Sequence, residues 1–248
     1  MAQPDRLVVV WFRADLRLDD NPVLHEAQRL VQQGLASAVL PVYVLDPRAF
    51  GRTRWGSLKT GPFRAQFLLE CLRDLQVRLR RLAASELLVR AGRPEEELPR
   101  LLRGQAAAGG ALVLAEEQAA DEELRVSRAV RAALAEAGAE LRELWGYSLY
   151  HRADLPFRKD LGDLPDGFTP FLQRLERQCK VREVLPRPRR GSLPLPEGAA
   201  AAAGPEPPAW RDLPYGESVQ EPARDPRSAF KLKGGESAAQ LRLKHYLW

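Results

Sequence analysis

The sequence predicts an α/β fold: a doubly wound parallel sheet, followed by an extended linker and the start of a helical domain. Three observations lead to this prediction. Short runs that are apolar at nearly every position alternate with segments of helical periodicity up to about residue 150. A later stretch holds ten of the twenty prolines in the 248-residue chain. Beyond that stretch, a new amphipathic segment begins.

The predicted sheet has five strands. Each is a short run of mainly apolar residues, which is typical of strands buried on both faces and therefore of a parallel sheet. The runs are LVVVWF at 7–12, AVLPVYVL at 38–45, LLVR at 87–90, ALVL at 111–114 and, more weakly, ELREL at 140–144. Because helical segments lie between them, we expect one Rossmann-like, doubly wound domain over about residues 5–150.

Local signals define the helices between the strands. Asn21 followed by Pro22 predicts a helix start, because asparagine caps free backbone N–H groups and proline fits the first helical position. Gly34 predicts the end of that helix. The longest helical pattern follows Gly61-Pro62, with apolar residues three and four positions apart: Phe67, Leu68, Cys71, Leu72, Leu75, Leu79 and Leu82. Two more helical segments are expected at 95–102 and 121–137.

The second half of the chain is organised differently. One helix is predicted at 169–181, and the ten prolines lie between residues 186 and 226, together with the alanine run 199–203. This stretch cannot build a core and is predicted to be an extended connector. We expect an interdomain linker over 151–228. Over 229–248 we expect the first helix of a further domain, with nothing of its own to pack on.

Composition narrows the possible classes of protein. Two cysteines, Cys71 and Cys179, and three widely spaced histidines predict neither a disulfide framework nor a metal site. No apolar run approaches the ~20 residues of a membrane helix, and the amino terminus lacks the apolar stretch of a signal peptide. We therefore expect an intracellular protein. The net charge of +5 is compatible with an anionic partner, or simply with an arginine-rich solvated surface.

The usual phosphate-binding and catalytic motifs are missing from the sequence. Neither GxGxxG nor GxxxxGK[ST] occurs, and GSLKTGP at 56–62 has its glycines and Lys59 in the wrong order for a P-loop. The sequence gives no indication of a Ser-His-Asp or Cys-His arrangement for nucleophilic catalysis. Asp19 and Asp20 could form an acid–base pair, but adjacent carboxylates at a helix start are more often capping groups.

The charged turn RADLRLDD at 13–20 stands where a nucleotide-binding fold would have a glycine loop. We interpret it as a structural corner between the first strand and the first helix. Its charged side chains are expected to pair with one another or with neighbouring loops. These are Arg13, Asp15, Arg17, Asp19 and Asp20.

Two further charged segments each allow two interpretations. EEQAADEEL at 116–124 follows the fourth strand, where open α/β sheets bind their ligands. Its carboxylates could accept hydrogen bonds from a pterin or purine edge, or could simply favour the amino-terminal turn of the next helix. KVREVLPRPRR at 180–190 has five positive charges and one negative. It could contact a DNA backbone, or be the solvated start of the linker.

Several motifs, in order along the chain, resemble the photolyase/cryptochrome family. VVVWFRADLRLDDNPVL at 8–24 is similar to the amino-terminal signature of that family. KTGPFRAQFLLECLRDLQ at 59–76 is similar to a helix of its cryptochrome DASH branch. WGYSLYHRADLPF at 145–157, FTPF at 168–171 and DPRSAFKLKGGESAAQLRLKHYLW at 225–248 also resemble cryptochrome DASH. The resemblance covers the whole chain and is weakest in the proline- and alanine-rich connector.

The resemblance implies a two-domain blue-light flavoprotein. The amino-terminal domain would hold a methenyltetrahydrofolate antenna, and an all-helical domain would hold FAD and the DNA-lesion pocket. The expected activity is light-driven repair of cyclobutane pyrimidine dimers, preferentially in single-stranded DNA. The acidic residue that contacts the folate falls best on Glu122, with Asp121 as the alternative. The family's folate site also draws a contact from the helical domain.

Other family positions that contact FAD and the lesion would lie beyond Trp248, so no catalytic, FAD-binding or metal-binding residue is assigned. We expect this chain, by itself, neither to hold FAD nor to repair DNA; stoichiometric flavin absorbance that survives gel filtration would contradict this. The alternative is a non-enzymatic short isoform that acts as a weak folate-binding or interaction module. In either case we expect a monomer without a membrane partner.

Overall fold

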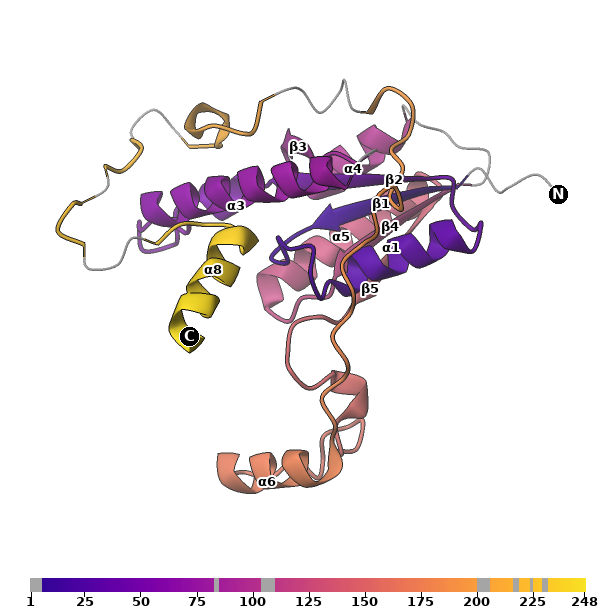
Figure 1. The fold of residues 1–248 in the computed structure, drawn as a ribbon, viewed down its shortest axis with the longest axis vertical. Helices are drawn as coiled ribbons and strands as arrows, with labels where there is room; N and C mark the ends of the chain where they lie inside the picture. Colours follow the sequence, from indigo (N-terminus) through magenta and orange to yellow (C-terminus); the bar gives the residue numbers. More distant parts are fainter. Residues whose placement is uncertain are drawn as a thin grey trace.

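The structure confirms the predicted doubly wound sheet (Figure 1). The computed structural model describes residues 6–82, 85–103, 110–199, 206–215, 219–223, 225–228 and 232–248. Five parallel strands lie in the order β3-β2-β1-β4-β5. Their bounds are Leu7–Phe12 (β1), Ala38–Leu45 (β2), Leu88–Ala91 (β3), Ala111–Glu116 (β4) and Ala139–Leu144 (β5).

Helices pack on both faces of the sheet, so the domain has two apolar cores. The side chains of α1 (Pro22–Gln32) and α3 (Pro62–Arg81) fill one core, and those of α4 (Pro94–Arg103) and α5 (Asp121–Glu136) fill the other. All six residues of β1 are buried, and they enter the two cores alternately. Val8, Val10 and Phe12 lie on the α1 and α3 side, whereas Leu7, Val9 and Trp11 lie on the α4 and α5 side. This explains the continuous apolar run in the sequence.

The first helix begins where the sequence predicts. The Asn21 side chain accepts hydrogen bonds from the backbone N–H of Val23 at 2.9 Å and of Leu24 at 3.1 Å, which satisfies two donors that the helix leaves free. Gly34 follows α1 with φ +67°, a conformation that glycine adopts without strain. The short helix α2 (Pro47–Phe50) and α3 also begin at a proline.

The winding of the chain reverses between two central strands. From β1 the chain passes through α1 to β2 on one side, and from β3 it passes through α4 to β4 on the other. β1 and β4 are therefore neighbours whose connections leave toward opposite faces. In open α/β sheets, the carboxyl ends of two such strands are the preferred position for a ligand.

After β5 the chain leaves the sheet and forms a separate projection. It contains the short helix η1 (Arg152–Asp154) and α6 (Phe168–Gln178), which lies well away from the sheet at the bottom of Figure 1. The rings of Phe157 and Phe171 stack with their centroids 5.3 Å apart, and Arg174 lies 4.7 Å over the Phe157 ring. The helix ends three residues before the predicted bound of 181, because Cys179 is extended.

The connector that follows runs back along the α/β domain. The backbone N–H of Val39 donates to the Pro194 carbonyl at 2.7 Å, and that of Gly191 donates to the Leu82 carbonyl at 2.7 Å. Leu193 and Leu213 are buried in the core beneath α1 and α3, and Ala199 is buried in the other core. The connector thus adds to the cores of the α/β domain without building one of its own. The rest of the alanine run, 200–203, lies outside the described residues.

The last helix, α8 (Glu236–Leu247), corrects one expectation. The sequence predicted that it would have nothing to pack on, yet its first turn is bound to the α/β domain. The Glu236 carboxylate accepts hydrogen bonds from the backbone N–H of Leu18 at 2.7 Å and of Asp19 at 3.0 Å. Gly234 lies so close to α3 that a Cβ there would meet the Phe67 carbonyl oxygen at 2.3 Å. The contact was missed because it joins positions more than 200 residues apart.

Candidate functional site

Polar groups gather at the carboxyl ends of β1 and β4, where the winding reverses. Glu116 is the last residue of β4 and is buried, although the sequence predicted that this strand ends at 114. Its carboxylate accepts a hydrogen bond from Gln118 Nε2 at 3.0 Å, and Arg17 Nη1 lies 3.9 Å away. Asp15, in the turn after β1, accepts hydrogen bonds from the Arg13 backbone N–H at 3.0 Å and from Asn21 Nδ2 at 3.2 Å.

Burial shifts the titration of this pair of carboxyl groups. Loss of water around Glu116 raises its pKa, and the negative charge of Asp15 raises it further. Burial likewise raises the pKa of Asp15, against the hydrogen bonds that favour its charged form. Both carboxyl groups therefore hold a proton more readily than exposed ones. Sequence patterns gave no sign of this pair, because Asp15 and Glu116 come together only through the sheet.

The corner at 13–20 has the structural role that the sequence predicted. Arg187 from the connector binds Asp19 through two hydrogen bonds of 2.5 and 2.7 Å, and lowers the pKa of that carboxyl. Asp20 accepts a hydrogen bond from the Leu185 backbone N–H at 2.9 Å. Arg13 is buried against the Trp11 ring, 4.6 Å from its centroid. The charges of the corner thus fasten β1 to the connector and to neighbouring elements.

Arg13 also joins the first strand to the far end of the sheet. Its guanidinium donates to Ser127 Oγ at 2.8 Å, to the Glu123 backbone oxygen at 3.2 Å and to Glu143 at 3.4 Å. Burial lowers the pKa of this arginine, while the charge of Glu143 opposes the shift. Since every polar contact of the group is internal to the domain, its role is to hold α5 in place beside the candidate edge.

Glu122 and Asp121, the predicted folate-contacting residues, lie in the first turn of α5 at the same edge. Both side chains are exposed, at 72% for Glu122 and 67% for Asp121. Lys59 Nζ lies 2.8 and 2.9 Å from the two Glu122 oxygens, so the loop before α3 and the start of α5 are bridged. Asp121 pairs with Arg125 one turn along the helix. Their role in binding stays a prediction.

Glu123, the third acidic residue of that turn, differs from its neighbours. Its Oε2 atom is buried and has no hydrogen-bond partner among the described residues. An unpartnered buried oxygen is rare and costly, and marks a place where a donor is missing. In the sequence, nothing distinguishes Glu123 from the other acidic residues of the run 116–124.

The basic segment at 180–190 makes internal ion pairs. Arg182 binds Asp154 at 2.6 and 2.8 Å, and Arg187 binds Asp19. Two of its five positive charges are therefore neutralised within the chain, which favours the interpretation as the start of the linker over contact with a DNA backbone.

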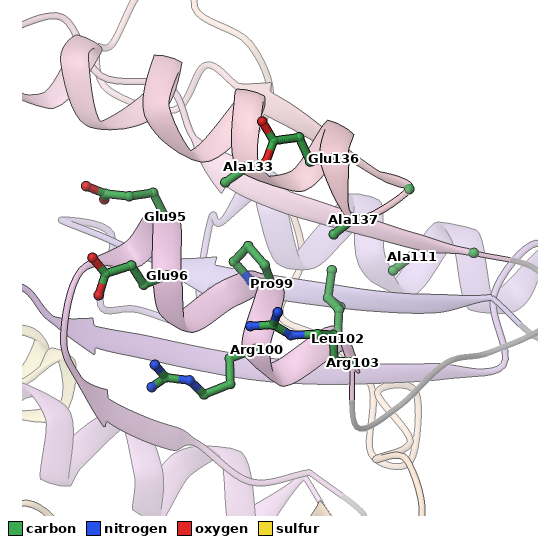
Figure 2. Close-up of a pocket in the computed structure, with 12 residues that line it drawn as sticks. Glu95, Glu96, Pro99, Arg100, Leu102, Arg103, Ala111, Ala133, Glu136 and Ala137 are labelled. Atoms are coloured by element: carbon green, nitrogen blue, oxygen red, sulfur yellow. The ribbon is translucent and has the colours of Figure 1, made fainter.

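A groove lies elsewhere on the molecule, away from this edge. The groove, of about 770 Å³, runs beside α4 and reaches the end of α5 and the amino-terminal ends of β4 and β5. Glu95, Glu96 and Glu136 line it together with Arg100 and Arg103 (Figure 2). It does not include the predicted acidic pair, and its floor at Ala111 is at the opposite end of β4 from Glu116.

The part of the chain that the structure describes shows no cluster of three His, Cys, Asp or Glu side chains suited to a metal ion. In the same residues, no helix has the length and apolar character that crossing a membrane requires. The two cysteines are both free.

Comparison with known proteins decides the family. The model of the DNA photolyase family matches residues 8–190. The chain belongs to this family. A cryptochrome DASH from Xenopus laevis is 41% identical over 251 residues, and one from Danio rerio is 38% identical over 246 residues. The chain is covered at 100% and 98% in these comparisons, whereas it spans only 44% of each relative. The motifs that suggested cryptochrome DASH are thus confirmed by relatives along the entire chain.

Solved structures of the photolyase/cryptochrome family show the same fold. A cryptochrome from Synechocystis sp. superposes with a TM-score of 0.80 at 33% identity, over 100% of this chain and 47% of that one. An archaeal photolyase from Sulfolobus tokodaii, described as holding two FAD molecules and implying a novel light-harvesting cofactor, gives a TM-score of 0.61 at 23% identity. At that identity the likeness shows the fold alone. The chain spans less than half the length of these cryptochrome relatives.

Proposed function

We propose that this chain is the antenna-binding α/β half of a cryptochrome DASH-type blue-light flavoprotein. The observation that carries the proposal is the likeness to cryptochrome DASH proteins along the whole chain. The longer protein would use reduced FAD to donate an electron to cyclobutane pyrimidine dimers, preferentially in single-stranded DNA. The α/β half would hold a methenyltetrahydrofolate antenna at the carboxyl edge of its sheet, supplying absorbed light energy to the flavin.

The hydrogen-bond acceptors at this edge fit a pterin ring. The amide and amino groups of a pterin present adjacent N–H donors, which a carboxylate can accept as a pair. Glu122 offers such a carboxylate at the surface, and Asp121 is the alternative one residue away. The bridge from Lys59 to Glu122 does not block this role, because an exposed ion pair contributes at most about 1 kcal/mol. The amino terminus of α5 adds a favourable dipole for the carboxylate itself.

A titration of this chain with methenyltetrahydrofolate tests the proposal. Binding is followed by the fluorescence anisotropy of the folate, for the wild type, Glu122→Gln and Asp121→Asn. We expect Glu122→Gln to weaken binding by at least about fivefold, the loss of one charge-assisted hydrogen bond. Glu96→Gln is the matched control, since Glu96 is also an exposed acid in the first turn of a helix, here α4. Equal affinity in all four proteins would reject the assigned site.

The second candidate, a non-enzymatic interaction module, is favoured by one observation. Apolar side chains of α8 are exposed, among them Leu241, Leu243, Tyr246 and Leu247. An apolar surface of this kind is typical of a protein-binding face. Gel filtration with an apolar dye separates the candidates: a sharp monomer peak without dye binding counts against the module.

A further inference from the structure

A short hairpin between β2 and α3 has a surface unlike the rest of the molecule. Residues 51–60 are closed by a backbone bridge between Arg52 and Leu58, and by the hydrogen bond from the Thr53 N–H to the Ser57 carbonyl at 2.8 Å. The Gly56 N–H donates to the Thr53 carbonyl at 3.0 Å, which completes the turn. Gly56 has φ +84°, a conformation that glycine adopts without strain. The loop is therefore a defined structure.

Trp55 stands at the tip of this hairpin. Its residue surface is 76% exposed, and the Arg54 guanidinium lies 4.0 Å from the centre of its ring. With one face of the indole covered by the cation, the other face is open to solvent. The Trp55 backbone N–H also donates to Thr53 Oγ1 at 3.3 Å, so the main chain beside the ring is held in place. An aromatic side chain displayed in this way loses little freedom on binding a partner.

The charged residues that flank Trp55 in the sequence are all positive. Between Asp46 and Glu70 the sequence has five cationic residues and no acidic one. Two of them are used internally, because Arg48 pairs with Asp46 and Glu95, and Lys59 pairs with Glu122. The other three, Arg52, Arg54 and Arg64, are exposed and make no ion pair with a described residue. Phe63, in the first turn of α3, is a further exposed ring at 66%.

An open aromatic face among unpaired arginines is the combination that binds single-stranded nucleic acid. Bases stack on aromatic rings whatever their identity, and arginines neutralise the phosphates between them. A protein partner would require acidic groups around an apolar anchor, whereas a base and its phosphates supply a flat ring and negative charge together. Double-stranded DNA would leave the indole face unused, because its bases are already stacked.

We propose that the hairpin 51–60 binds single-stranded nucleic acid, with one base stacked on the open face of Trp55 and backbone phosphates neutralised by Arg52, Arg54 and Arg64. This contact lies on the α/β domain itself and requires neither light, flavin nor folate. The hairpin adjoins the antenna residue Glu122 through Lys59. Because Trp55 and the three arginines are not assigned to the folate, either proposal can fail without the other.

Binding of a fluorescein-labelled twelve-nucleotide oligothymidylate to the whole chain tests the proposal. Fluorescence anisotropy is measured in the dark, without flavin or folate, at several salt concentrations. We expect Trp55→Ala to weaken binding by about tenfold, the effect of losing one stacked base. We expect Arg54→Gln to reduce the slope of log affinity against log salt by about 0.7, the loss of one phosphate contact on a single strand.

Controls and a second readout keep the result specific. Tyr147→Ala removes another exposed ring, and Arg125→Gln removes an exposed arginine that is already paired with Asp121; both are expected to bind as the wild type does. Irradiation of an oligonucleotide containing 5-iodouracil is expected to crosslink Trp55. The proposal is overturned if the chain does not bind, if Trp55→Ala binds as the wild type does, or if a duplex of the same length binds equally well. Crosslinks confined to other residues would also overturn it.

Discussion

The carboxylate of Glu236 lies 3.1 Å from the guanidinium of Arg78, with only 9% and 8% of the two side chains exposed. This ion pair joins the first residue of α8 to α3. Arg78 also lies 3.3 Å from Asp19, so the pair extends to the charged corner after β1. The contact therefore fixes the start of α8 against the α/β domain.

Removing the Glu236 carboxylate should release α8 from the domain. Glu236→Ala takes away the acceptor of the Leu18 and Asp19 N–H groups and the partner of Arg78. A hydrogen bond to a charged group contributes about 2 kcal/mol, so hydrogen exchange of these two amides should accelerate by roughly 30-fold. Lys244→Ala, at an exposed position of the same helix, is the control. Unchanged exchange in Glu236→Ala would show that α8 is held by other contacts.

Adding a methyl group at Gly234 should also release α8 from the domain. An added Cβ would lie 2.3 Å from the Phe67 carbonyl oxygen, which is backbone and cannot move aside easily. We expect Gly234→Ala to displace α8, and limited proteolysis to cut the chain before this helix. Gly51→Ala is the matched control, because its nearest neighbour would lie at an ordinary 3.7 Å. Equal protease resistance of the two variants would mean that α8 does not need the close approach at Gly234.

The connector should contribute to stability as a core element does. Leu193 is 1% exposed and lies in the core beneath α1 and α3. We expect Leu193→Ala to lower the free energy of unfolding by about 2 to 4 kcal/mol, as for a buried leucine within the domain. Urea denaturation measures this change, with Leu72→Ala in α3 as the reference and exposed Val184→Ala in the connector as the control. If Leu193→Ala lowers the free energy of unfolding no more than Val184→Ala does, the connector is only loosely attached.

The raised pKa of Glu116 predicts how stability changes with pH. Because burial raises this pKa, the folded chain binds the proton more readily than the unfolded chain, in the range above the ordinary value of 4.5. The contribution of Glu116 to stability therefore improves as the pH falls from neutral into that range. We expect Glu116→Gln to be at least as stable as the wild type at neutral pH. Its stability should increase less than that of the wild type as the pH is lowered. Urea midpoints at several pH values test this, with Glu96→Gln as control. If lowering the pH stabilises Glu116→Gln more than the wild type, the buried carboxyl favours its charged form.

Features set by neighbouring residues could be predicted from the sequence. The buried run of β1, the cap at Asn21 and the end of α1 at Gly34 depend on contacts within a few positions. The docking of α8 could not be predicted, since Glu236 meets Leu18 across 218 positions and a glutamate at a helix start has a local explanation. The burial of Leu193 was missed for the same reason, because prolines in the connector indicated only an extended chain.

The candidate site was predictable only in part. Acidic residues at the start of a helix give the same sequence pattern whether they bind a ligand or stabilise the helix dipole. The pattern alone therefore did not assign a binding role to Glu122 or Asp121. The family resemblance assigned them. Asp15 and Glu116 meet through strand order, and the buried Glu123 oxygen depends on how α5 packs. Trp55 and its arginines were visible in the sequence, but only the structure shows the ring exposed beneath Arg54.

The proposed antenna site at the carboxyl edge of the sheet can be located by NMR. The amide spectrum of the isotopically labelled chain is recorded during titration with methenyltetrahydrofolate. We expect shifts confined to the loop around Lys59 and to the first turn of α5 at Asp121, Glu122 and Glu123. Shifts confined to the groove beside α4, around Arg100 and Ala137, or no shifts at all, would contradict it.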